Sequence, residues 1–334
     1  MRRLLSILCS SVNLRVLLLP GNTPAAVQTV TKGGFMSQAP LRRKPWHAVF
    51  LALLCSLWVL PASAGPIILG GDDLTDHGSA TSIGVGNAQG WLYIQRAITN
   101  ILSPGSNITR SGHIPGRIAA LGAAPSGSLS GDAGAAIGSA AAAAGFTVDY
   151  YDGAAAINAF FAGLANNTVP NPAMIWIAGT GASNDLDSTE GAALTANAAA
   201  ISAFVGSGGG LMAHGSGADA YGWLTALLPG LTENNTCSVP SGVLTPAGVT
   251  AFPGLTNSDI SAGPCHSSFS GTLGGLQVLA NDTNGLHFII GGGAGTTLVA
   301  ADIGPIPTLS EWGMIILSSL LALGTIITLR RQRQ

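Results

Sequence analysis

The chain has 334 residues and a formal net charge of −2. That near-neutral total hides an acidic centre, because residues 65–304 carry 12 Asp and two Glu against three Arg and no Lys, a formal charge of −11. So acidic a region repels polyanions, which argues against nucleic acid and anionic lipid as its partners.

Residues 36–64 have the three parts of a secretory signal peptide. The charged part consists of Arg42, Arg43 and Lys44. An apolar run at 48–60 follows, and an A-x-A cleavage site then ends at Ala64, before Gly65. We therefore expect the secretion machinery and signal peptidase as partners.

Residues 1–35 precede this signal and do not fit a normal leader. We interpret them as a mis-assigned start of translation, with Met36 as the true first residue. An unusually long leader is the alternative. In both cases the exported domain spans residues 65–304, enough for one sizeable core.

Apolar runs alternate with Ala-rich helical patterns in the first part of this domain, which is typical of βαβ units. Strands are expected at 66–69, 117–121, 146–150, 173–178 and 211–213. Helices are expected at 89–102, 132–144, 154–165, 189–205 and 221–228. These elements predict an α/β fold with an open, mostly parallel, flavodoxin-like sheet covered by helices on both faces.

From Cys237 onwards the pattern changes to Gly-, Pro-, Ser- and Thr-rich loops. Short strands are expected there at 277–279, 287–290 and 297–300. Of the four cysteines, two fall in the leader segments, which leaves Cys237 and Cys265 for one disulfide in the exported domain. Such a bond stabilises by about 3–4 kcal/mol through the entropy of the unfolded chain.

The last 30 residues, 305–334, form a tripartite tail. Residues 312–329 are uncharged and just long enough to cross a bilayer, so we expect a transmembrane helix there. A basic cluster follows, made of Arg330, Arg331 and Arg333. Such a cluster stays in the cytoplasm, so the rest of the chain is expected outside.

The start of this tail carries a recognisable motif, formed by Ile306, Pro307, Thr308 and Leu309 and then Glu311, Trp312 and Gly313. With the apolar stretch and the basic end, it resembles the IPTL-CTERM sorting signal of Gram-negative bacteria. The resemblance implies an exosortase-type membrane enzyme as partner, transient anchoring in the inner membrane, and delivery to the cell surface or the medium. An ordinary C-terminal membrane anchor is the alternative.

The central domain is similar to the class I glutamine amidotransferase-like fold, and within it to the trehalose-utilisation-type branch. The similarity rests on Tyr151-Asp152 and on residues 176–179, 208–215 and 221–224. Amidotransferase chemistry needs a thiolate at a Gly-x-Cys-x-Gly turn. Aligning that turn on residues 211–215 puts Ala213 at the nucleophile position, so glutaminase activity is not expected.

Polar residues follow several of the predicted strands, and in a parallel sheet such residues meet at one edge. These residues are Asp72, Asp73, Asp76, His77, Asp152, Asp185, Asp187, His214 and Ser216. If the domain has catalytic residues, His214, Asp72, Asp73 and Ser216 are the candidates, acting as a hydrolase or on carbohydrate. Turn formation and helix capping explain the same residues without any function.

We therefore expect an exported protein with a non-catalytic domain that binds or has a structural role, and the hydrolase is the competing hypothesis. No cofactor and no metal are expected, although an acidic edge with histidine is compatible with a hard cation.

Overall fold

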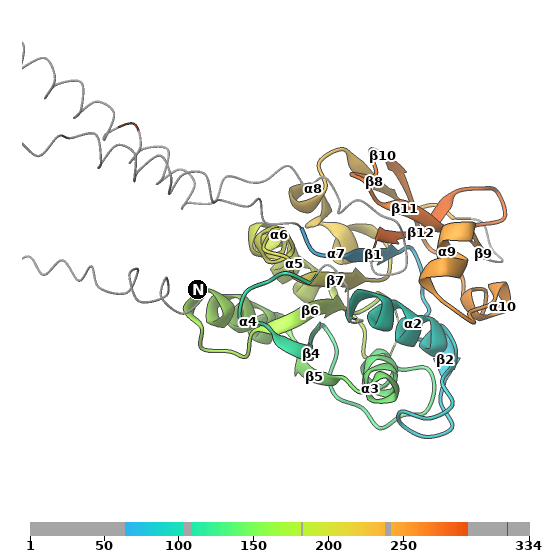
Figure 1. Ribbon diagram of the computed structural model, residues 1–334, viewed down its shortest axis with the longest axis horizontal. Helices are drawn as coiled ribbons and strands as arrows, with labels where there is room; N and C mark the ends of the chain where they lie inside the picture. The colour runs from blue at the N-terminus through green and yellow to red at the C-terminus, as the bar shows by residue number, and fades with distance from the viewer. Residues whose placement is uncertain (1–63, 103–107, 182, 238–241, 293–318, 320–334) are drawn as a thin grey trace, which may run out of the picture. The chain divides into compact units, whose positions relative to one another are not determined.

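The computed structural model (Figure 1) describes residues 64–102, 108–181, 183–237 and 242–292, together with Ser319. Six predicted features lie outside the described residues: the leader at 1–35, nearly all of the signal peptide at 36–64, the strand at 297–300, the sorting motif at 306–313, all of the transmembrane helix at 312–329 except Ser319, and the basic cluster at 330–333. None of the helices formed by the described residues is long and apolar enough to cross a membrane.

Five parallel strands form one half of the central sheet, in the order β5-β4-β6-β7-β1. They are β1 (Ile67–Gly70), β4 (Ile114–Leu121), β5 (Thr147–Tyr151), β6 (Pro172–Ile177) and β7 (Gly210–Ala213). Every residue of β1, β6 and β7 is buried, as expected for strands covered on both faces. The predicted α/β architecture with a parallel centre is confirmed.

The order of these strands differs from the flavodoxin-like expectation. Numbered along the chain, the five parallel strands have the spatial order 3-2-4-5-1, whereas a flavodoxin-like sheet has 2-1-3-4-5. The first strand, β1, pairs in parallel with β7 and antiparallel with β12 (His287–Gly292). Pairing between such distant segments is not encoded in local apolar patterns, so this finer prediction was wrong.

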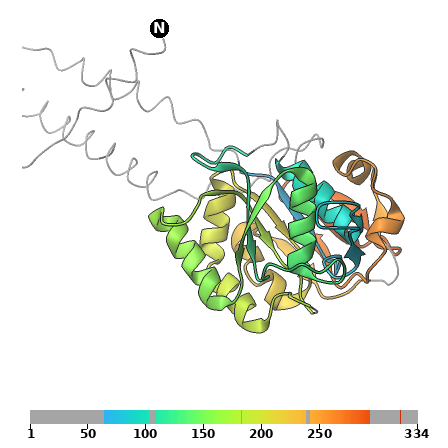
Figure 2. The same cartoon turned by 90° about the horizontal axis from the view of Figure 1, so that it is seen from below.

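Helices cover both faces of the parallel strands (Figure 2). On one side lie α2 (Gly90–Leu102) and α3 (Ala133–Ala144), and on the other α4 (Ala154–Asn166), α5 (Ser188–Ala196) and α6 (Ala198–Gly206). Local sequence sets the ends of α3: Asp132 accepts a hydrogen bond from the Ala135 N–H at 2.8 Å, and Gly145 takes the left-handed conformation at φ 75°.

The helix predicted at 189–205 is divided into α5 and α6. At the break, the Asn197 side-chain amide donates to the Ala193 carbonyl at 2.9 Å and to Asn158 Oδ1 at 2.7 Å. Asparagine side chains compete with the helical hydrogen bonds in this way. The helix predicted at 221–228 is likewise two short ones, α7 (Gly217–Tyr221) and α8 (Leu224–Leu227).

The C-terminal part of the domain is more regular than its composition suggests, because it forms the antiparallel half of the same sheet. Beyond β12 come β10 (Ser268–Gly271) and β8 (Leu231–Asn234), two strands that the sequence pattern did not predict. Alongside β12 lies β11 (Gln277–Asn281), which also pairs with β9 (Val243–Leu244). Three small elements complete this description: the α9 (Pro246–Ala251) and α10 (Asn257–Ile260) helices, and a separate ribbon of β2 (Gly78–Ser79) with β3 (Ala88–Gln89).

Candidate functional site

The carboxyl ends of β1, β6 and β7 are neighbours in the sheet, and main-chain hydrogen bonds shape the loops that follow them. The Gly215 N–H donates to the Asp72 carbonyl at 3.0 Å, and the Leu186 N–H donates to the Gly179 carbonyl at 2.9 Å. The second bond folds the loop after β6 back toward the sheet, with Asp185 next to the turn. The polar residues at this edge fall into two separate groups.

The first group is a buried chain of three side chains. His214 Nδ1 lies 2.7 Å from Asp72 Oδ1, and His214 Nε2 lies 3.1 Å from the indole nitrogen of Trp176. The histidine and the aspartate are both completely buried. Because an indole N–H can only donate, Nε2 must accept, so the imidazole proton lies on Nδ1 and is donated to Asp72.

This arrangement leaves His214 without a free ring nitrogen. A general base needs a lone pair within reach of the substrate, usually directly or through one water. The lone pair on Nε2 is occupied by Trp176, and the whole ring is shielded from solvent. The buried chain is therefore suited to holding the ends of β1, β6 and β7 together.

Two tyrosines enclose the buried chain. Tyr221 donates from its hydroxyl to the Gly70 carbonyl at 2.7 Å, while the Tyr93 ring packs edge-on against His214. Burial, and next the negative charge of Asp72, raise the pKa of both tyrosines well above its ordinary value. Both phenols are therefore neutral and act as packing groups.

The second group lies nearer the solvent and consists of Asp73, Asp76 and Asp185 with His77 and His266. One carboxylate oxygen of each aspartate lies within 4.8 Å of the other two. His77 Nε2 and His266 Nε2 are each 3.2 Å from the same oxygen, Asp73 Oδ2. This group is called the rim cluster below.

Electrostatics in the rim cluster disfavour three ionised carboxylates. Burial, and next the charge of Asp73, raise the pKa of Asp76 from 3.8 to about 6. A hydrogen bond to Asp73 raises the pKa of His266. Both shifts favour extra positive charge in the cluster, whether it is supplied by protons or by a cation.

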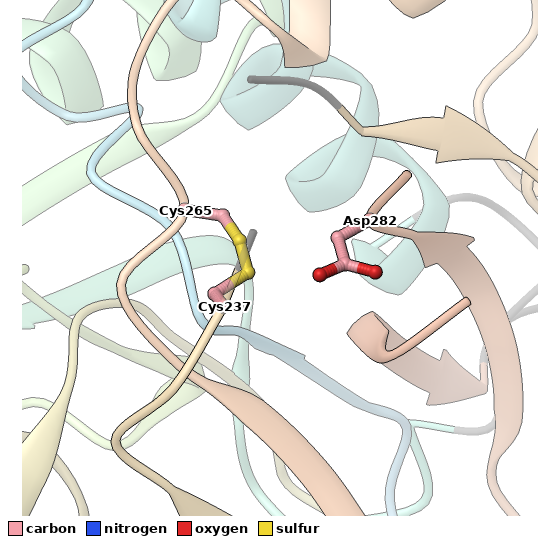
Figure 3. A group of neighbouring side chains, drawn as sticks. All are labelled: Cys237, Cys265 and Asp282. Carbon is pink, nitrogen blue, oxygen red and sulfur yellow. A yellow bond between two sulfur atoms is a disulfide. The ribbon is translucent and has the colours of Figure 1, made fainter. Parts of the chain in front are cut away.

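His266 reaches the rim cluster because the disulfide fixes its segment. Cys237 and Cys265 are bonded, with their Cα atoms 5.6 Å apart, as the cysteine count predicts (Figure 3). Next to the bond, the His266 N–H donates to the Gly71 carbonyl at 2.8 Å. A side chain at Gly71 would collide with the Ser267 main chain, so this close approach requires glycine.

Asp282 lies beside the disulfide (Figure 3), but the three residues do not make a metal site. Both sulfurs are consumed in the bond. The Asp282 carboxylate accepts from the N–H groups of Asn284 and Leu286 at 2.9 and 2.8 Å, which stabilises the turn between β11 and β12.

The remaining candidates lie outside both groups. Ser216 bonds to Thr180 through its main chain, and it has no open nitrogen of His214 to pair with. Asp152 is exposed after β5. Asp187 caps α5, and its hydrogen bond from the Thr189 hydroxyl lowers its pKa.

Glu190 is a buried acid that the sequence did not single out. Its two carboxylate oxygens accept from the main-chain N–H groups of Gly153 and Asp187, at 2.6 and 2.8 Å. The glutamate thus ties the loop after β5 to the start of α5. The capping-box spacing from Asp187 to Glu190 was the signal that could have revealed it.

Ala213, at the expected cysteine position, is the last residue of β7 and is buried. The two cysteines of the exported domain are joined in the disulfide. Among the described residues, no thiol is free for nucleophilic attack.

Comparison with family models matches the IPTL-CTERM motif at residues 305–333. No curated protein and no solved structure matches the chain. The matched segment is the tail that opens with Ile306-Pro307-Thr308-Leu309. The chain therefore carries the C-terminal sorting signal of an exported protein, and this signal implies processing by an exosortase-type enzyme.

Proposed function

We propose that the α/β domain of this exported protein acts at the bacterial cell surface or envelope by binding, or as a structural element, without catalysing a reaction. The observation that carries this proposal is the occupied imidazole of His214, held by Asp72 and Trp176 and shielded from solvent. The alanine at the amidotransferase nucleophile position supports the same conclusion.

The route of delivery is part of the proposal. The signal peptide at 36–64 directs export, the helix at 312–329 holds the chain in the inner membrane with its basic end in the cytoplasm, and the sorting enzyme then removes the tail. Gly65, the expected first residue of the mature domain, is already part of the fold, because its N–H donates to the Val205 carbonyl at the end of α6, at 2.9 Å.

Mass spectrometry of the exported protein tests this route. We expect an N-terminus at Gly65 and a C-terminus near Ile306. A mature product that keeps residues 312–334 would contradict removal of the tail and would make the protein a stable membrane anchor. A product that begins before Met36 would show that residues 1–35 are a translated leader.

A hydrolase is the second candidate, and the 2.7 Å contact between His214 and Asp72 favours it, because catalytic histidines are oriented by carboxylates in this way. Assays with p-nitrophenyl acetate and p-nitrophenyl glycosides decide between the two. We expect no turnover above that of a His214→Asn variant. Turnover that disappears in His214→Asn but persists in Asp152→Asn would overturn the non-catalytic proposal.

A further inference from the structure

Three carboxylates from two loops crowd together at the rim cluster. Asp73 and Asp76 come from the loop after β1, and Asp185 comes from the loop after β6. Carboxylates at this separation repel one another, and more strongly where the protein excludes solvent. The group therefore requires a source of positive charge.

Three oxygens of this group have no hydrogen-bond donor among the described residues. Asp73 Oδ1 and both carboxylate oxygens of Asp76 are shielded from solvent and unpartnered. Because nearly all buried polar atoms in native proteins have a partner, such exceptions indicate a water, an ion or a proton. One carboxylate oxygen of Asp76 lies within 4.8 Å of an oxygen of Asp73 and of an oxygen of Asp185, so it borders the space that the three acids share.

The two imidazoles determine which oxygen of Asp73 stays open. His77 and His266, from separate segments, both contact Asp73 Oδ2 at 3.2 Å. As N–H donors they hold the carboxylate in one orientation and leave Oδ1 unpartnered. Donors outside the coordination sphere orient the carboxylate ligands of metal ions in the same manner.

In the part of the chain that the structure describes, no Lys or Arg acts on the Asp76 carboxyl. Residues 65–304 contain no Lys. Two of the three Arg are engaged elsewhere, Arg117 with Asp149, and Arg110 with Asn171 and over the Phe204 ring. The charged groups that act on the Asp76 carboxyl are Asp73, Asp185, His77 and Asp132.

We propose that Asp73, Asp76 and Asp185 hold a hard divalent cation, with Ca²⁺ as the preferred ion. This assignment rests on the binding role proposed above and names its ligand. Carboxylate oxygens suit Ca²⁺, Mg²⁺ and Mn²⁺, and the flexible geometry of Ca²⁺ best tolerates three carboxylates, with waters in the remaining positions. The Thr75 hydroxyl, 3.4 Å from Asp185 Oδ1, keeps the third ligand in place.

The test uses the exported protein, stripped of metal with EDTA and titrated with CaCl₂, MgCl₂ or ZnCl₂ at pH 7. We expect calorimetry to show one Ca²⁺ site, and Ca²⁺ to raise the thermal unfolding midpoint. Asp76→Asn and Asp185→Asn should weaken Ca²⁺ binding by about 100-fold, and His266→Gln by about tenfold. Asp152→Asn, which removes an exposed carboxylate outside the cluster, should leave the affinity unchanged.

Two results would overturn the assignment. Absence of both Ca²⁺ heat and a midpoint shift would mean that a proton shared by Asp76 and Asp185 neutralises the cluster. Preference for Zn²⁺, lost in His266→Gln, would make the imidazoles ligands instead of orienting groups. Asp76→Asn removes a repelled charge, so it is expected to fold, and near-ultraviolet circular dichroism checks this. Hydrolysis that depends on His214 would contradict the non-catalytic role of the domain. It would not bear on the Ca²⁺ site, which the titration tests on its own.

Discussion

Asp72 and Asp73 are consecutive residues with opposite environments. Asp72 is completely buried and accepts from the His214 imidazole and from the Leu74 N–H. Asp73 lies at the rim cluster, next to two more aspartates and two histidines. A single step along the chain thus separates a group that holds the fold together from a group that is open to a ligand.

The comparison shows which of the two groups has room for function. In the buried chain the hydrogen-bonding capacity of His214 is used up, so its loss affects mainly stability. In the rim cluster the carboxylates repel one another, so a bound cation should raise the stability of the protein. Substitution of a rim-cluster aspartate should weaken the binding of that cation. The four predictions below test this division between a structural group and a ligand-binding group.

The largest effect is expected from removing Asp72. Asp72→Ala leaves the His214 Nδ1–H and the Leu74 N–H buried without an acceptor, which should lower the free energy of unfolding by about 3 kcal/mol or more. Asp73→Ala, the matched neighbour, should change it by less than about 1 kcal/mol in EDTA. Urea unfolding of both variants measures the difference. An equal loss of unfolding free energy in the two variants would contradict the assignment of Asp72 to the fold and of Asp73 to ligand binding.

The next effect is expected from the disulfide. Replacing Cys237 and Cys265 together by Ala should lower the free energy of unfolding by about 3–4 kcal/mol, because the bond closes a loop across a sequence separation of 28 residues. It should also loosen His266, which follows Cys265, and leave His214 in place. NMR spectra of the histidine side chains report on both. A change at His214 as large as that at His266 would show that the two groups are not independent.

The smallest effect is a pH dependence of stability in EDTA. Because the folded protein raises the pKa of Asp76 from 3.8 to about 6, it binds more protons than the unfolded chain between these values. The free energy of unfolding should therefore fall as pH rises from about 4 to 6, and the loss should persist above. The carboxylate oxygens are shielded but the residue as a whole is partly exposed, so we expect about 1 kcal/mol after solvent screening.

Asp76→Asn is the variant that checks this pH dependence. It should flatten the decline between about pH 4 and 6, whereas Asp152→Asn should not. Saturating Ca²⁺ should restore the stability lost by the wild-type protein at pH 7. An unchanged slope in Asp76→Asn would assign the decline to other groups.

Local features of the fold were predictable from the sequence. The buried strands were visible as apolar runs, and the helix expected at 132–144 is observed as α3. The convergence of polar residues at strand ends followed from the general behaviour of parallel sheets. These predictions succeed because they depend on neighbours in the chain.

Features that depend on distant pairing were not predictable. The position of β1 beside β7 and β12 depends on long-range pairing, and so does the recruitment of β8 and β10 into the sheet. The separation of Asp72 from Asp73 depends on Trp176 and His266, which reach the site from other strands and loops. A sequence pattern does not show which of two adjacent carboxylates a distant donor will meet.

The most direct test of the division is the tautomer of His214, measured by long-range ¹H–¹⁵N NMR at pH 7. We predict the proton on Nδ1, donated to Asp72, and an unprotonated Nε2 that accepts from Trp176. The signal should keep this form when Ca²⁺ is added. A proton on Nε2 would contradict the account, because Nε2 could then not accept from Trp176, and the imidazole would not be held between Trp176 and Asp72.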